Sequence, residues 1–150
     1  MNTIIQFTKA CRIVILILFT IALTQPTYCS GSDCGGFGDG FVALMTGWLG
    51  ILFAQGIYFV WLANPFMIAA WFYIPKLPKL ATLFYLIASI ICLCFLKGEE
   101  VYINAKGESA KITGFCSGYW LWTSAAIVGF LSSLSIWIMK VRYKKLDEEV

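Results

Sequence analysis

The sequence predicts an all-α membrane protein, a four-transmembrane-helix bundle with a kinked second helix and a small extracytoplasmic β-hairpin. Two observations predict this class. Hydrophobic residues make up 60% of the 150 residues and charged residues only 13%, which is too few charges to cover a soluble domain of this size. The hydrophobic residues also gather in segments long enough to cross a bilayer, separated by short polar loops. We therefore expect a single integral membrane domain over residues 1–150.

The first predicted span covers residues 5–25 and carries Lys9 and Arg12. A cleaved secretory signal peptide has a similar basic and apolar pattern, but small residues precede its cleavage site. Here the bulky Tyr28 precedes Cys29, a poor match to signal-peptidase or lipoprotein processing. We favour an uncleaved first helix whose two cations extend toward the membrane surface, with the cleaved peptide as the alternative.

Residues 26–40 form a turn-rich loop between the first two apolar segments. The loop contains Asp33 and Asp39 but neither lysine nor arginine, which is typical of the extracytoplasmic side. No strand precedes its glycines and no lysine follows them, so a phosphate-binding loop is disfavoured. We expect a flexible linker.

The longest uncharged stretch, residues 41–74, exceeds a single membrane crossing. A continuous helix of this length would reach about 50 Å, against about 30 Å for a hydrocarbon core. Asn64 and Pro65 mark the expected break, because proline disfavours helix at the preceding residue and lacks an N–H of its own. We expect a span over 41–62 and a shorter continuation over 65–74 that kinks back or lies at the interface.

Two further spans are predicted over residues 80–96 and 117–139, with a polar segment between them. In that segment, branched and aromatic residues flank a turn-like stretch, residues 104–108, which predicts a β-hairpin. An isolated hairpin is marginally stable in water, so we expect it to pack on the outer end of the bundle.

The basic residues predict the orientation, because positively charged loops face the cytoplasm. We expect a multi-pass membrane protein with both termini in the cytoplasm. The lysines and arginines expected inside are Lys9, Arg12, Lys76, Lys79, Lys140, Arg142, Lys144 and Lys145. Those expected outside are Lys97, Lys106 and Lys111.

Six cysteines are the most chemically suggestive residues. Cys29, Cys34 and Cys116 are expected at or beyond the outer face, where an oxidising compartment favours disulfides. Cys29 with Cys34 is the simplest bridge because the loop between them is short, and Cys34 with Cys116 is the alternative. Cys92 and Cys94 are expected to face different neighbours, since two residues correspond to about 200° of rotation on a helix.

Four spans with cysteine pairs on the outer side resemble the quinone-linked disulfide oxidases that recharge periplasmic thiol oxidases. The resemblance implies a membrane thiol–disulfide oxidoreductase. The family's Cys-x-x-Cys beside a quinone-contacting arginine is missing here, and the nearest counterpart is Cys92-Leu93-Cys94. The competing interpretation is a structural disulfide with small apolar thiols inside the bundle.

Other chemistry is not indicated. Histidine is absent, and no serine, lysine or carboxylate pair stands in a motif of nucleophilic or acid–base catalysis. The outer acidic residues lack the spacing of a calcium loop, and nucleic-acid binding would require a basic patch interleaved with aromatics. We expect no catalytic residue, no metal, no cofactor and no nucleic-acid partner. Gln55 and Asn64 more often join helices by hydrogen bonds than conduct a substrate, although a break at Asn64 is the best argument for a transporter.

Three motifs occur in order along the chain: Gly47-Trp48-Leu49, Trp61-Leu62-Ala63-Asn64-Pro65 and Gly118-Tyr119-Trp120-Leu121-Trp122. Together they resemble a group of small four-span bacterial inner-membrane proteins of uncharacterised function. The resemblance implies a bacterial four-span protein and no particular activity.

A non-enzymatic role is the expectation that fits these features. The chain would act as a polytopic binding or accessory protein that recognises another membrane component, either another membrane protein or a second copy. One version is an immunity protein against a membrane-acting toxin, because blocking a toxin helix requires only complementary lateral packing. The expected packing or recognition positions are Gln55, Trp61, Asn64, Pro65, Tyr119 and Trp120.

Overall fold

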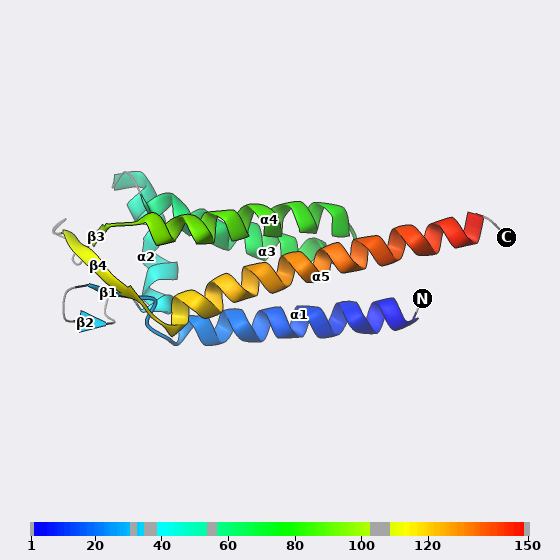
Figure 1. Ribbon diagram of the computed structural model, residues 1–150, viewed down its shortest axis with the longest axis horizontal. Coiled ribbons are helices and arrows are strands. Elements are labelled where there is room, and N and C mark those ends of the chain that lie inside the picture. The colour runs from blue at the N-terminus through cyan, green and yellow to red at the C-terminus, as the bar shows by residue number, and fades with distance from the viewer. Residues whose placement is uncertain (1, 31–32, 35–38, 54–56, 103–108, 149–150) are drawn as a thin grey trace.

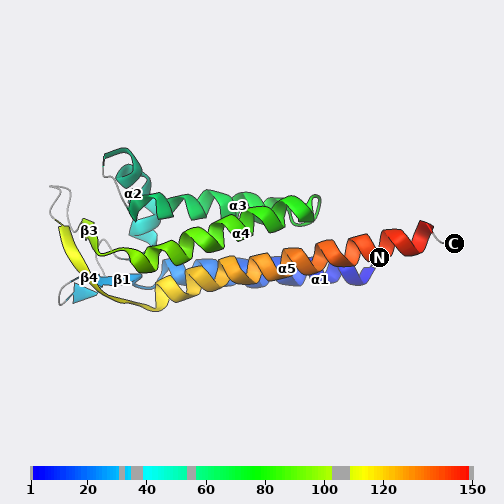
Figure 2. The same ribbon diagram turned by 45° about the horizontal axis from the view of Figure 1, so that its top comes forward.

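The computed structural model describes residues 2–30, 33–34, 39–53, 57–102 and 109–148, and these are mostly helical. The long helices lie side by side along one axis, and a small antiparallel sheet lies at one end of them (Figure 1). Both chain termini lie toward the other end, as a second view also shows (Figure 2). We call these the sheet end and the terminal end.

Among the described residues, three helices are long and apolar enough to cross a membrane. Their bounds are α1, Asn2–Leu23; α4, Pro78–Cys94; and α5, Ser117–Glu148. They correspond to the predicted spans at 5–25, 80–96 and 117–139. A short 3-10 turn, η3 (Phe95–Lys97), extends α4 toward the sheet, and α5 continues beyond its predicted end into the charged tail.

The central uncharged stretch is divided differently from the prediction. α2 covers Gly40–Phe53, the 3-10 helix η2 covers Ile57–Leu62, and α3 follows η2 directly over Ala63–Tyr73. α2 runs across the long axis near the sheet end, whereas α3 lies alongside α4 (Figure 1). Gln55 lies outside the described residues.

The prediction of one continuous helix over residues 41–62 is wrong. The indole Nε1 of Trp61 donates a hydrogen bond to the carbonyl oxygen of Leu44 at 2.8 Å, whereas residues this far apart on a single helix would be separated by about 25 Å. The chain therefore folds back so that η2 packs on α2. Gly47 makes the approach possible, because a Cβ there would lie 2.5 Å from Cδ1 of Trp61.

Asn64 and Pro65 do not interrupt a helix but lie in the first turn of α3. Proline is tolerated there because the first N–H groups of an α-helix lack a partner within the helix. What changes at this point is the geometry, from the 3-10 form of η2 to the α form of α3.

Small residues on α5 allow close packing against α4. Tyr85 of α4 is fully buried, and a Cβ on Gly129 of α5 would lie 2.6 Å from its Cζ. Ala125 and Ser133, one turn before and one turn after Gly129, are also fully buried. Such spacing of small residues lets two helices approach in a membrane, where packing rather than water exclusion holds helices together.

The sheet contains the predicted hairpin. β3 (Glu100–Tyr102) pairs antiparallel with β4 (Ser109–Phe115), and Val101 lies opposite Ala110. The predicted turn at 104–108 lies outside the described residues. Val101 is buried against Phe95 and Tyr119 in a small core, which agrees with a hairpin stabilised by packing on the bundle.

The first loop is more ordered than predicted. β1 (Tyr28–Ser30) pairs antiparallel with both β2 (Asp33–Cys34) and β4, so the strands lie in the order β2-β1-β4-β3. A flexible linker is therefore the wrong description for these residues. The ladder formed with β4 satisfies backbone groups that a free loop would leave to water.

The backbone pairing continues past β1 to the start of α5. The N–H of Cys116 donates to the carbonyl oxygen of Thr27 at 2.9 Å, and that of Gly118 donates to the carbonyl oxygen of Pro26 at 2.9 Å. A Cβ at Gly118 would lie 2.7 Å from the carbonyl oxygens of Gln25 and Pro26, so only glycine fits. The exit from α1 and the entry into α5 thus form one unit.

Candidate functional site

The sheet end holds a disulfide between Cys29 and Cys34. The two cysteines are directly paired across β1 and β2, with their Cα atoms 4.1 Å apart. Direct pairing of two residues on neighbouring antiparallel strands brings their side chains to the same face, as a disulfide requires. The simpler of the two predicted bridges is therefore the one present, and the alternative bond between Cys34 and Cys116 is not.

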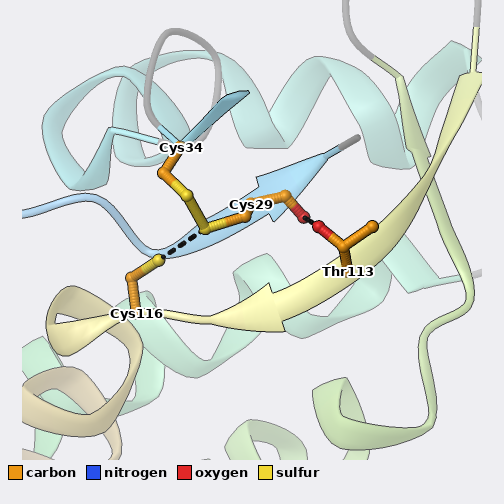
Figure 3. Close-up of a disulfide and its surroundings, with 4 residues drawn as sticks. All are labelled: Cys29, Cys34, Thr113 and Cys116. Atoms are coloured by element: carbon orange, nitrogen blue, oxygen red, sulfur yellow. Dashed lines mark hydrogen bonds between the residues drawn. A yellow bond between two sulfur atoms is a disulfide. The ribbon is translucent and has the colours of Figure 1, made fainter. Parts of the chain in front are cut away.

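Cys116 lies next to this disulfide. Its backbone position is fixed by the hydrogen bond to Thr27, one residue beyond the pairing of Tyr28 with Phe115. Its Sγ lies 3.1 Å from Sγ of Cys29, as Figure 3 shows. Because Cys29 has no thiol proton in the disulfide, Cys116 must be the donor in this contact.

The backbone of β1, which carries Cys29, is hydrogen-bonded to β2 on one side and to β4 on the other. Thr113 Oγ1 donates to the carbonyl oxygen of Cys29 at 3.3 Å (Figure 3), and its backbone lies in β4, which pairs with β1. Cys34 is exposed, whereas Cys29 and Cys116 are half-buried. The cluster therefore has one solvent-facing sulfur and two that are partly covered.

The three sulfurs lie within 4.8 Å of one another, close enough for a soft metal ion. A metal ligand must be a thiolate, and two of the three sulfurs are bonded to each other. In the disulfide form the cluster offers a single thiol, from Cys116, so this form does not supply a metal site.

An aromatic cluster packs beside the three cysteines, because Tyr28 and Phe115 are the sequence neighbours of Cys29 and Cys116. Tyr28 meets Phe95 edge to face, with ring centroids 5.9 Å apart, and Phe115 lies 4.8 Å from the ring of Tyr119. Burial raises the pKa of Tyr28 to about 12, and nearby Tyr58 adds to the effect. The Tyr28 phenol therefore stays neutral at physiological pH and packs as part of this aromatic cluster.

Several predicted packing or recognition residues join helices inside the bundle. Asn64 is buried; its side-chain oxygen accepts a hydrogen bond from Trp122 Nε1 at 2.9 Å, and its amide donates to the Trp61 carbonyl oxygen at 3.1 Å. The hydroxyl of buried Tyr119 donates to the Cys92 carbonyl oxygen at 3.2 Å. These contacts link η2 and α3 to α5, and α5 to α4.

Two predicted positions lie on the surface. Trp120 is 51% exposed at the beginning of α5, beside Tyr119, and Pro65 is exposed on α3. The structure therefore separates the predicted set into internal contacts and surface groups. Trp122, which binds Asn64, was missed because the two are far apart in sequence.

The remaining cysteines are separate from the cluster. Cys92 is fully buried in α4, Cys94 is half-buried on a different side of the same helix, and Cys11 lies in α1 toward the terminal end. All three are free thiols. The expectation that Cys92 and Cys94 face different surroundings is therefore met.

Arg12 lies between helices rather than extending freely to the membrane surface. Its guanidinium carbon is 3.9 Å from the ring centre of Trp71, and Trp71 Nε1 donates to the Arg12 carbonyl oxygen at 3.0 Å. A cation over an indole face is attracted by the ring's quadrupole. This pairing between α1 and α3 could not be predicted from the sequence, because it depends on how the helices pack.

Comparison with protein-family models, with curated proteins and with solved structures found no match for this chain. Its function must therefore be inferred from its own residues.

Proposed function

We propose that the chain is a non-enzymatic binding or accessory protein of the bacterial inner membrane that recognises another membrane protein laterally. In this proposal it crosses the membrane four times, through α1, η2 with α3, α4 and α5. The three long apolar helices support it, as does the position of α3 beside α4 (Figure 2). α2, which lies across the bundle, would rest near the outer membrane surface.

The distribution of charge supports cytoplasmic termini. Lys140 Nζ donates to the Pro75 carbonyl oxygen at 2.8 Å in the turn between α3 and α4, and Lys79 lies 5.9 Å from the ring centre of Trp137. The basic part of the tail lies at this end, and Arg12, in the middle of α1, contacts Trp71 near the end of α3. Cationic ends face the cytoplasm in membrane proteins.

The observation that carries the binding proposal is a difference between two exposed helix faces. On α4 the exposed membrane-facing positions are all large and aliphatic: Leu83, Leu86, Ile90 and Leu93. On α5 the corresponding face includes two serines: Trp120, Ser124, Ile127, Leu131, Ser135 and Ile138. Large aliphatic side chains suit lipid, whereas small hydroxyl residues are enriched where one membrane helix contacts another.

The serines favour a helix partner because of their size. Ser135 Oγ donates to the Leu131 carbonyl oxygen at 2.8 Å, so its hydroxyl is already satisfied within α5. Because Ser124 and Ser135 are small, they leave space on the surface of α5, and a neighbouring helix can place a larger side chain there. A lateral contact of this kind is sufficient for an immunity protein that blocks a membrane-acting toxin.

A photo-crosslinking amino acid placed in living cells tests the proposal. At Ser124 or Ser135 we expect a discrete protein adduct, whereas the matched positions Leu86 and Ile90 on α4 should give none. An adduct at twice the protein's own mass would identify a second copy as the partner. Equal yields from both helices, or no protein adduct from α5, would refute the proposal.

The immunity version has its own test. Deleting the gene should sensitise cells to a membrane-acting toxin encoded beside it, and a Ser124→Leu and Ser135→Leu double variant should fail to restore protection. A double variant on α4, Leu86→Ile with Leu93→Ile, is the control and should protect fully. Unchanged survival of the deletion strain during toxin expression would exclude this version.

A further inference from the structure

We propose that Cys29, Cys34 and Cys116 form a thiol–disulfide exchange centre with two disulfide isomers. The observation is the contact between the free thiol of Cys116 and one sulfur of the existing disulfide, at 3.1 Å. This centre is separate from the lateral surface on α5, because β1, β2 and β4 lie at the sheet end of the bundle (Figure 1).

The exchange needs no external oxidant or reductant. The thiolate of Cys116 attacks Sγ of Cys29, the Cys29–Cys34 bond breaks, and a Cys29–Cys116 bond forms. Cys34 leaves as a thiolate and takes up a proton, while Cys116 has given one up to solvent. One S–S bond and one thiol are present before and after the step, so no electrons enter or leave.

The geometry selects which sulfur is attacked. Cys116 faces Cys29, the half-buried partner of the disulfide, so Cys34 is the leaving group. The pairing of Thr27 with Cys116 and of Cys29 with Gly114 holds the two sulfurs on neighbouring backbones. Such positioning converts exchange into an intramolecular reaction with a high effective concentration.

Exchange moves the free thiol to a different environment. Before the step the free thiol is Cys116, which is half-buried, and after it the free thiol is Cys34, which is exposed. The rate of thiol–disulfide exchange with a partner depends on how accessible the reacting sulfur is. Cys34 is therefore the sulfur that a disulfide-bearing partner or a thiol reagent meets.

The exchange can be trapped with N-ethylmaleimide on the intact, detergent-solubilised protein at pH 8, where thiolates are available. Non-reducing proteolysis and mass spectrometry then locate the maleimide and the remaining disulfide. We expect maleimide on Cys34 together with a Cys29–Cys116 bond. Maleimide on Cys116 alone, with Cys29–Cys34 intact throughout, would overturn the proposal.

Two variants separate exchange from simple reactivity. Cys116→Ser removes the attacking sulfur and should abolish maleimide labelling of Cys34, whereas Cys92→Ser, which changes a buried cysteine outside the cluster, should leave that labelling unchanged. Cys34→Ser should form a Cys29–Cys116 disulfide on oxidation with diamide. Persistence of two free thiols in the folded Cys34→Ser protein, or labelling of Cys34 in Cys116→Ser, would refute the exchange.

Discussion

Adding one methyl group at Gly129 tests how α4 and α5 pack. In Gly129→Ala the new Cβ would lie 2.6 Å from Cζ of fully buried Tyr85. Overpacking of this kind costs about 1–3 kcal/mol, while alanine gains up to about 1 kcal/mol over glycine in helix propensity. The overlap should therefore prevail, and we expect a net loss of up to about 2 kcal/mol in the free energy of unfolding.

A double-mutant cycle isolates the overlap from the helix propensity. Tyr85→Leu shortens the side chain facing Gly129, so adding Gly129→Ala in that background should be neutral or stabilising. The propensity gain is common to both backgrounds and cancels, leaving a coupling energy of about 1–3 kcal/mol. Gly114→Ala is the control, because a Cβ at Gly114 would meet no heavy atom within 4 Å.

The measurement is reversible unfolding in bicelles by steric trapping, supported by the thermal midpoint from size-exclusion fluorescence. If Gly129→Ala destabilises the protein equally with tyrosine or leucine at position 85, the two sites are not coupled. That result would refute the close contact between α4 and α5 on which the packing argument depends.

Three further predictions follow from other contacts. Asn64→Leu removes the acceptor of Trp122 Nε1 and should cost about 1–2 kcal/mol, measured by the same unfolding assay. In oxidised Cys34→Ser the Cys29–Cys116 bond joins residues with a sequence separation of 87, whereas in Cys116→Ser the Cys29–Cys34 bond joins residues with a separation of 5. Loop-closure entropy should therefore make the free energy of unfolding of oxidised Cys34→Ser larger than that of Cys116→Ser by about 2.5 kcal/mol. Tyr28 has its pKa raised by burial to about 12, so the neutral phenol stabilises the fold fully below pH 10 and progressively less as the pH rises toward 12. The stability lost at alkaline pH should therefore be smaller in Tyr28→Phe than in the wild-type protein. The measurement is the fall in thermal midpoint between pH 9 and pH 11.5, made on both proteins with their free thiols alkylated.

The elements that could be predicted from the sequence are those with strong local patterns. The long apolar helices follow from uninterrupted hydrophobic segments, and the β3–β4 hairpin follows from branched residues around a turn. The Cys29–Cys34 disulfide follows from a short loop between the two cysteines. Each depends on neighbours in the sequence, so no knowledge of the packing is needed.

The features that could not be predicted depend on distant residues. β1 and β2 are too short to show an alternating pattern, and β1 is ordered by pairing with β4. Trp122 and Asn64 are 58 residues apart, and nothing local indicates their hydrogen bond. The four-residue spacing of Ala125 and Gly129 indicates a packing face on α5, but nothing local indicates that α4 is the helix that packs there.

The location of the cysteine cluster connects the exchange centre to the bundle. Residues 26–27 and 116–118 already join the exit of α1 to the entry of α5 by backbone hydrogen bonds. A Cys29–Cys116 bond would add a covalent link across the same junction, whereas Cys29–Cys34 joins only the neighbouring strands β1 and β2. The two isomers therefore differ in whether α1 and α5 are covalently tied at the sheet end. Because α1 and α5 pack along much of their length, exchange at the sulfurs would alter the resistance of this helix pair to separation while leaving its packed interface unchanged.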